Sequence, residues 1–185
     1  MGEAPRKGVP LTAPIADVVA SRLRDIPDFP VPGVVFKDFT PLLSDGPAFR
    51  AVVQDISSRY AGQVDVIVGI EARGFILGAA VAYELGIGFV PVRKAGKLPG
   101  ETHSAEYQLE YGSAVIEVHM DAFIAGARVL VMDDVLATGG TAEATCALIE
   151  RAGANVAAVE VVLELGFLNG RSKLPGRTVH AMLSV

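Results

Sequence analysis

The sequence is poor in the features that mark secreted or membrane proteins. Its 185 residues include one cysteine, Cys146, so no disulfide can form within the chain, and a reducing compartment, the cytoplasm, is expected. No apolar run reaches the roughly 18 residues that a membrane-spanning helix requires. The first ten residues also lack the apolar centre of a signal peptide. We therefore expect neither a membrane span nor a secretory leader.

Positive charge is scarce as well. Sixteen Lys and Arg residues stand against 21 Asp and Glu residues, which gives a formal net charge of −5 and a pI near 5.2. This balance argues against a general nucleic-acid or membrane surface, so an anionic ligand would have to meet a few locally placed cations. A hydrophobic content of 51% with 20% charged residues predicts one globular domain over residues 1–185.

Several common catalytic motifs are missing. The sequence contains no Walker A pattern, no G-x-G-x-x-G, no zinc-binding H-E-x-x-H and no G-x-S-x-G. His103, His119 and His180 lack the spacing of metal ligands, and we interpret them as ordinary satisfied or exposed histidines. Cys146 is interpreted as a small core residue within a helix.

The most informative stretch reads R-V-L-V-M-D-D-V-L-A-T-G-G-T and covers residues 128–141. Residues 129–132 are typical of a strand buried on both faces of a parallel sheet, and Asp133 and Asp134 follow it. Residues 136–141 are mostly small, and they lead into a helical pattern over residues 142–151. A glycine loop that opens a helix directs free backbone N–H groups toward one point, which predicts a phosphate site.

The two aspartates restrict what that phosphate belongs to. Carboxylates beside a phosphate would repel it unless they face ribose hydroxyls or a bound cation. The pattern therefore favours a phosphorylated sugar, and the hydroxyls of Thr138 and Thr141 can donate further hydrogen bonds to it. The alternative is an ordinary strand-to-helix turn with an acidic start.

Two acidic residues followed by T-G-G-T resemble the phosphoribosyl-pyrophosphate (PRPP) signature of type I phosphoribosyltransferases. The resemblance implies an α/β fold with a mostly parallel central sheet flanked by helices, a small N-terminal hood and a β flap. It implies that Asp133 and Asp134 bind the ribose hydroxyls, directly or through water on a magnesium ion that the substrate mainly holds. No residue is assigned as a direct ligand of magnesium. The residues expected to grip the 5′-phosphate are Ala137, Thr138, Gly139, Gly140 and Thr141.

A second informative stretch, residues 28–41, contains three prolines and three phenylalanines. From composition it is either a rigid lid with an aromatic surface for a flat ligand or a proline-rich loop packed on the core. Its pattern D-F-P-x-P-G-V-V-F-K-D resembles the hood of adenine phosphoribosyltransferases. The resemblance implies that Phe36 stacks on adenine while backbone groups of Val35 and Lys37 read the edge of the base.

A third polar turn follows the strand predicted over residues 64–70. The sequence E-A-R-G-F occupies residues 71–75, and a helical pattern continues over residues 76–85. Ligands bind at the carboxyl edge of open α/β sheets, and the pyrophosphate loop of the resembled family occupies this place. Arg73 is therefore expected to bind pyrophosphate. The alternative is a surface ion pair with Glu71.

The predicted flap follows a strand over residues 89–93. A loop rich in glycine and cations leads to strands over residues 105–111 and 114–119, with the flap loop at about residues 94–112. The resemblance implies that Arg93, Lys94 and Lys97 approach pyrophosphate, and the alternative is a solvated basic loop.

The flap also contains L-E-Y-G. In the resembled family a glutamate at the position of Glu110 faces the purine's imidazole ring, where it can exchange a proton with the base. Strand alternation alone makes Glu110 an ordinary polar residue. Tyr111, beside it, is included among the expected substrate-binding residues. The remaining predicted elements are helices over residues 14–26 and 45–60 and strands over residues 156–165 and 178–183.

The resemblance implies a magnesium-dependent purine salvage enzyme. It would convert adenine and PRPP to AMP and pyrophosphate, and it would act as a cytoplasmic homodimer. An enzyme for hypoxanthine, guanine or xanthine would keep the PRPP half of the site and differ in the hood. A non-catalytic PRPP-sensing regulator is a further alternative, and it would usually bring a DNA-binding segment and a basic face.

Overall fold

The computed structural model describes residues 10–108 and 113–185. The chain divides into two compact units, and the division falls after Ile56, within a helix. No helix in the described ranges is both long and apolar enough to cross a membrane.

The first unit consists of short helices and one β hairpin. The hairpin is antiparallel and pairs Pro27 with Val35 and Arg24 with Asp38. The helix predicted over residues 14–26 was wrong beyond Ala20, because the chain leaves the helix there and residues 24–27 pair as a strand instead. The elements of this unit are α1 (Ile15–Ala20), β1 (Arg24–Pro27), β2 (Val35–Asp38), α2 (Thr40–Ser44) and α3 (Gly46–Tyr60), which extends past the division.

Asp38 fixes the end of this hairpin. Its carboxylate accepts hydrogen bonds from the Thr40 hydroxyl at 2.6 Å, from the Thr40 N–H at 2.9 Å and from the Arg24 guanidinium at 2.5 Å. These bonds, chiefly those from Thr40, lower the pKa of Asp38 to about 2. The hairpin is thereby joined to the start of α2.

The second unit is built on a seven-stranded sheet with the order β5-β6-β4-β3-β7-β8-β9. The strands from β4 to β9 in this order are parallel, and β6 and β5 are added antiparallel as a hairpin. The strand bounds are β3 (Val66–Ile70), β4 (Gly88–Lys94), β5 (Thr102–Gln108), β6 (Ser113–His119), β7 (Arg128–Leu136), β8 (Asn155–Glu164) and β9 (Val179–Ser184).

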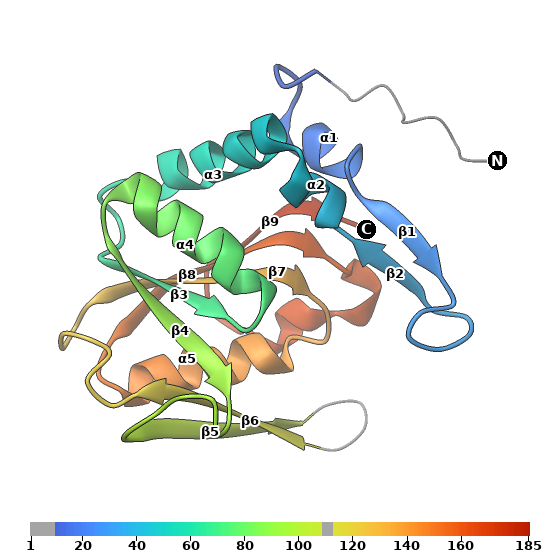
Figure 1. Cartoon of the computed structure of the whole chain (residues 1–185). Helices are drawn as coiled ribbons and strands as arrows, with labels where there is room; N and C mark the ends of the chain where they lie inside the picture. Colours follow the sequence, from blue (N-terminus) through green and yellow to red (C-terminus); the bar gives the residue numbers. More distant parts are fainter. Residues whose placement is uncertain (1–9, 109–112) are drawn as a thin grey trace. The chain divides into compact units, whose positions relative to one another are not determined.

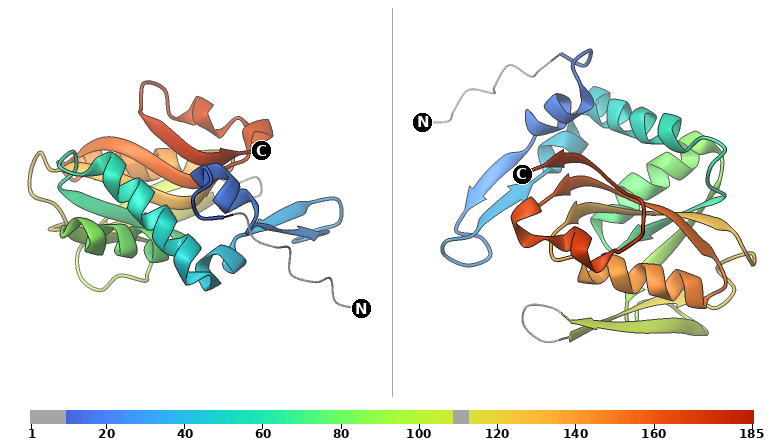
Figure 2. Two further views of the ribbon diagram at one scale, coloured as in Figure 1. Left: turned by 90° about the horizontal axis from the view of Figure 1, so that it is seen from above. Right: turned by 180° about the vertical axis from the view of Figure 1, so that it is seen from behind.

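Two helices cover the sheet on opposite faces (Figure 1 and Figure 2). From β3 the chain passes through α4 (Arg73–Leu85) to β4 on one side, and from β7 it passes through α5 (Gly140–Arg151) to β8 on the other. Right-handed crossovers in opposite directions place their helices on opposite faces. The core beneath α5 contains Cys146, fully buried as predicted. The predicted mostly parallel sheet flanked by helices is therefore confirmed.

The parallel register brings three strand ends to one edge. Ile70 of β3 lies opposite Val92 of β4, and Gly69 lies opposite Met132 of β7. The residues that follow these positions therefore meet at the carboxyl edge of the sheet. The strand β7 continues through both aspartates to Leu136, so they lie within the strand rather than after it.

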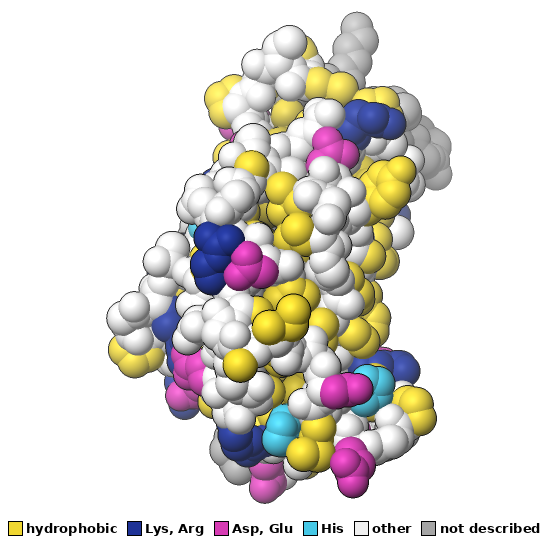
Figure 3. Space-filling view, turned by 90° about the vertical axis from the view of Figure 1, so that its left-hand side faces the viewer, with side chains coloured by type: hydrophobic (Ala, Val, Ile, Leu, Met, Phe, Trp, Pro, Cys, Tyr) yellow, Lys and Arg dark blue, Asp and Glu magenta, His cyan; other side chains and the backbone are white. Residues whose placement is uncertain are grey.

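The segment after β8 contains two short 3₁₀ turns, η1 (Gly166–Leu168) and η2 (Gly170–Lys173). Leu174 then returns to the core and is only 2% exposed. On the molecular face shown in Figure 3, charged side chains of both signs are dispersed among apolar ones.

A buried polar cluster joins the last turn of α3 to strands β8 and β9. Glu160 is fully buried, and its carboxylate accepts hydrogen bonds from Arg59 at 3.1 Å and from the Tyr60 hydroxyl at 2.8 Å. His180 Nδ1 lies 2.9 Å from the same carboxylate. Burial raises the pKa of Glu160, and its three partners act in the opposite direction.

We predict that Glu160→Ala lowers the free energy of unfolding by about 2 to 3 kcal/mol, because it leaves Arg59 and Tyr60 without the carboxylate that satisfies them. Urea unfolding followed by circular dichroism measures this loss. Glu84→Ala, at an exposed position of α4, is the control and should change little. A loss no larger than that of the control would contradict the importance of the cluster.

Candidate functional site

The candidate site begins where α4 packs against the end of β7. A Cβ atom added to Gly74 would lie 2.5 Å from the carbonyl oxygen of Met132, so only glycine allows the helix start to approach this closely. The approach brings Arg73 to Asp134, and Nη2 and Oδ2 lie 2.9 Å apart. The alternative considered for Arg73 was an ion pair with Glu71, and the structure shows an ion pair with Asp134.

The two aspartates differ in their surroundings. Asp134 is 5% exposed and forms the ion pair with Arg73, whereas Asp133 keeps a small exposed surface and accepts a hydrogen bond from the Asp134 N–H at 2.9 Å. Protein surrounds the Asp133 carboxyl on most sides, and this desolvation, with the neighbouring charge of Asp134, raises its pKa well above the usual value. The pair therefore favours a single negative charge, and Arg73 lies beside it.

The predicted phosphate loop connects β7 to α5. Gly139 has a left-handed φ of 82°, and its carbonyl oxygen accepts the first helical hydrogen bond, from the Glu143 N–H at 2.9 Å. The first N–H groups of a helix have no partner within the helix, and the helix dipole adds positive potential there. Thr138 is exposed. The loop thus has the composition and the place of an anion site.

The basic residues at the end of β4 are organised by Glu71. Its carboxylate accepts a hydrogen bond from Arg93 Nη2 at 2.9 Å and from the Lys94 N–H at 3.0 Å. These bonds, first those from Arg93, lower the pKa of Glu71. Arg93 also donates to the carbonyl oxygen of Lys97 at 3.0 Å. Glu71 and Ala72 are joined by a cis peptide bond.

Sequence reasoning missed the part that Glu71 plays. Its position two residues before Arg73 suggested a local ion pair, but its carboxylate also pairs with Arg93 of the adjacent strand β4. Knowing which strands are neighbours would have been needed to find this contact. The side chains of Lys94 and Lys97 are exposed, so their part in binding pyrophosphate stays a prediction.

The structure brings several of the predicted site residues together at one edge of the sheet. Arg73, Asp133, Asp134, Arg93 and the loop 137–141 share the carboxyl edge of one sheet. Glu110 and Tyr111 lie outside the described residues. The hood residues belong to the first unit.

Within that unit, Val35 is 53% exposed, and the rings of Phe36 and Phe29 meet edge to face with centroids 5.3 Å apart. The Lys37 ammonium group lies 2.8 Å from the Asp25 carboxylate.

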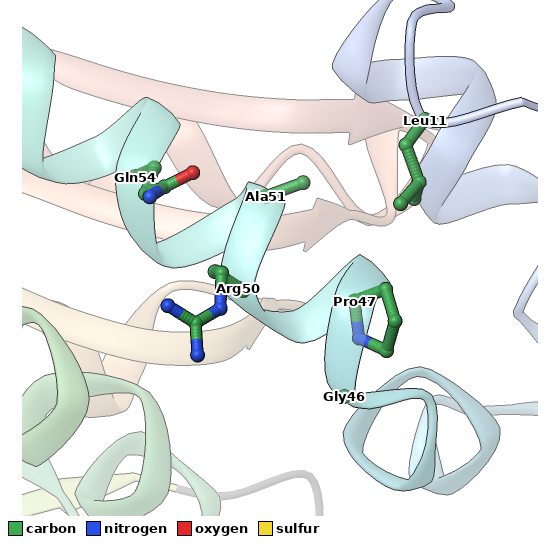
Figure 4. Close-up of a pocket in the computed structure, with 6 residues that line it drawn as sticks. All are labelled: Leu11, Gly46, Pro47, Arg50, Ala51 and Gln54. Carbon is green, nitrogen blue, oxygen red and sulfur yellow. The ribbon is translucent and has the colours of Figure 1, made fainter.

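Two further observations concern ligands. Among residues 10–108 and 113–185 there is no group of three or more His, Cys, Asp or Glu side chains placed to hold a metal ion. The first unit also has a hollow of about 590 Å³ at the start of α3 (Figure 4). It contains none of the predicted site residues; its lining is Leu11, Gly46, Pro47, Arg50, Ala51 and Gln54.

Comparison with known proteins supports the interpretation of this edge. Residues 43–174 match the phosphoribosyl transferase domain. An adenine phosphoribosyltransferase of Salinispora tropica is 64% identical over 172 residues, which cover 92% of this chain and 91% of that protein. The chain belongs to the phosphoribosyltransferase family, and within it to the adenine phosphoribosyltransferases.

Solved structures agree with this assignment. The crystal structure of the adenine phosphoribosyltransferase from Thermoanaerobacter pseudethanolicus matches with a TM-score of 0.87 and 47% identity, covering 90% of this chain and 98% of that one. The Saccharomyces cerevisiae enzyme, solved with an imino-altritol bisphosphate and adenine, matches with a TM-score of 0.88 and 41% identity over 91% of this chain and 98% of that one. The predicted type I phosphoribosyltransferase fold is thereby confirmed.

We predict that Asp133→Asn becomes more stable than the wild type as the pH rises. In the unfolded chain Asp133 loses its proton near the ordinary pKa of an aspartate, whereas in the folded protein it loses the proton only at a higher pH. Between these two pKa values the folded wild type therefore loses stability as the pH rises. The neutral asparagine carries no such titration, so the variant does not lose stability there. Urea unfolding at several values between pH 4 and pH 8 measures the difference between the two proteins.

Asp65→Asn is the control with the opposite sign. Asp65 pairs with Arg128 at 2.6 Å, and hydrogen bonds from Arg128 lower its pKa to about 2. This variant should be less stable than the wild type between pH 4 and pH 8, and the difference should disappear only when the measurements are extended below pH 4, through the pKa of about 2. If the stability difference between Asp133→Asn and the wild type does not grow as the pH rises, the raised pKa of Asp133 is contradicted.

Proposed function

We propose that this chain converts adenine and PRPP to AMP and pyrophosphate. One observation carries the proposal. At one edge of the sheet lie a glycine loop that opens a helix, a pair of carboxylates and two arginines, Arg73 at the start of α4 and Arg93 near the end of β4. A molecule with a phosphate, a ribose and a pyrophosphate needs these three kinds of group side by side. The family assignment and the adenine-bound yeast relative support the choice of reaction.

The loop 137–141 holds the 5′-phosphate in this proposal. Its backbone N–H groups and the hydroxyls of Thr138 and Thr141 donate hydrogen bonds, and the start of α5 adds a favourable dipole. Because these donors are fixed before the ligand arrives, little reorganisation is required on binding.

The aspartates bind the ribose hydroxyls. Burial and the neighbouring charge of Asp134 raise the pKa of Asp133, whereas Asp134 is the carboxylate paired with Arg73. Negative charge at this position stabilises the positive charge that develops on the sugar ring as pyrophosphate departs.

The leaving pyrophosphate is stabilised by Arg73 and by the basic end of β4, where Arg93, Lys94 and Lys97 lie. In the structure Arg73 and Arg93 lie against carboxylates, so the guanidinium groups are already oriented when the anion binds. An arginine fork matches the oxygens of a phosphate group closely.

The base is held by the hood and the flap. Phe36 stacks on adenine, and backbone groups of Val35 and Lys37 read its edge. Glu110 exchanges a proton with the imidazole ring of the purine, and Tyr111 is a further substrate-binding residue. These roles come from the family resemblance.

Magnesium fits the donor set at this edge. The protein offers two carboxyl groups, Asp133 and Asp134, but no group of three or more such side chains in its described part, which suits an ion that the substrate's pyrophosphate, its hydroxyls and water mainly hold. When bound, the ion neutralises charge on the pyrophosphate. We also propose that the protein is a cytoplasmic homodimer with the hood, the sheet and the flap in one domain over residues 1–185.

The test of the reaction is nucleotide formation from PRPP and magnesium with adenine, hypoxanthine, guanine and xanthine supplied separately. We expect AMP from adenine alone. Turnover with a 6-oxopurine instead would keep the PRPP site and contradict the role of the hood. Binding of PRPP without turnover of any base would favour a regulator.

We predict that Asp134→Asn reduces turnover at least about 100-fold, because the charge that stabilises the reacting sugar is lost. The free energy of unfolding should change by no more than about 1 to 2 kcal/mol, since Arg73 remains 40% exposed and can be solvated. Steady-state kinetics and urea unfolding measure the two effects. Asp65→Asn, which removes an Asp–Arg pair before the start of β3, should keep its turnover. An unaltered rate in Asp134→Asn would contradict its assigned role.

A further inference from the structure

The 3₁₀ segment after β8 packs against the phosphate loop, and the backbones of Gly170, Ala137 and Gly139 come closest. A Cβ atom added to Gly170 would overlap the carbonyl oxygen of Ala137, and a Cβ atom added to Gly139 would overlap the carbonyl oxygen of Gly170. The two backbones therefore leave no space for a side chain in either direction. Gly170 is buried, and its φ lies outside the left-handed region. The requirement for glycine at this position is spatial rather than conformational.

The segment is anchored firmly on either side of Gly170. Arg171 forms an ion pair with Glu164 at 2.7 Å and donates a hydrogen bond to the carbonyl oxygen of Val179 at 2.7 Å. The Ser172 hydroxyl donates to the Asn169 carbonyl oxygen at 2.7 Å. Leu174 is buried in the core beneath α5. Gly170 is thus held by strands β8 and β9 rather than by the loop that it touches.

The same segment also reaches the start of α5. A Cβ atom added to Gly139 would lie 3.0 Å from Cβ of Lys173, and the Lys173 ammonium group lies 3.9 Å from the Glu143 carboxylate in the first turn of the helix. The contact therefore covers both the loop and the helix start that supply the phosphate-binding N–H groups. A displacement of this segment would displace those donors together.

We propose that Gly170 is a positioning residue for the phosphate loop and sets the affinity of the site for the 5′-phosphate. The inference rests on the proposed function of the loop. Several backbone donors bind one phosphate well only when all of them point at it, and hydrogen bonds weaken steeply with misalignment. A side chain at Gly170 pushes the loop away from η2 and changes the direction of these donors. The arginines that bind pyrophosphate, after β3 and at the end of β4, are not affected.

The test uses Gly170→Ala in the full chain, with magnesium present. Isothermal titration calorimetry measures the affinity for ribose 5-phosphate and for pyrophosphate separately. We expect ribose 5-phosphate to bind at least tenfold more weakly and pyrophosphate to bind within about twofold of the wild type, because one misaligned phosphate site costs on the order of 1.4 kcal/mol or more. The KM for PRPP should rise.

Gly88→Ala is the matched control. A Cβ atom added to Gly88 would meet its nearest neighbour, Val66, at 3.7 Å, which is an ordinary contact. Both affinities should be unchanged in this variant. A merely structural role for Gly170 would lower the melting temperature and weaken the two ligands equally.

Arg171→Lys keeps the proposal testable if Gly170→Ala does not fold. Lysine retains the charge beside Glu164 but cannot form both contacts of the guanidinium group. We expect a smaller but equally selective loss, about threefold, for ribose 5-phosphate. Unchanged ribose 5-phosphate affinity, or equal loss of both ligands, in a folded variant would overturn the proposal. A wild type that binds ribose 5-phosphate but makes no AMP would overturn the proposed reaction and leave this inference standing.

Discussion

The site depends on the close contact between the start of α4 and the end of β7. Gly74 allows the helix backbone to reach the carbonyl oxygen of Met132, and this approach places the Arg73 guanidinium beside the Asp134 carboxylate. A larger residue would separate the two elements and leave a mostly buried carboxylate without its cation, which is costly. The same contact connects the E-A-R-G-F loop, which we propose binds pyrophosphate, to the aspartates that we propose bind ribose, so one steric requirement sets the distance between these two parts of the proposed site.

The arginines at this edge lie against carboxylates of the protein, Arg73 with Asp134 and Arg93 with Glu71. In the proposed function, each pairing limits the affinity of the arginine for pyrophosphate, because the anion must compete with a carboxylate for the guanidinium group. It also removes much of the conformational entropy that a free arginine would lose on binding. An enzyme that must release pyrophosphate in every turnover benefits from orientation more than from the tightest binding.

The sequence predicted most of the sheet and the local motifs, because the apolar runs of β3, β7 and β8 and the glycine loop after β7 carry their information within a few residues. It failed where a contact joins separate elements. The helix predicted beyond Ala20 is a strand because residues 24–27 pair with β2, and Glu71 binds Arg93 because β4 lies beside β3. Neither partner is visible from local spacing. The raised pKa of Asp133 follows from its burial, and two adjacent aspartates in a sequence do not show how deeply each of them is buried.

The phosphate loop illustrates why a glycine motif alone does not determine a binding site. Two glycines permit many backbone conformations, and that freedom would disperse the N–H donors unless something outside the loop selected one arrangement. In this chain the selecting surface is the backbone of η2, which Arg171 holds against β8 and β9. The backbone of η2 restricts the loop sterically, and it brings no side chain that would compete with the loop for the phosphate. The flexibility that makes glycine useful beside an anion is thus limited by a segment about thirty residues further along the chain, and the motif and its support must be considered together.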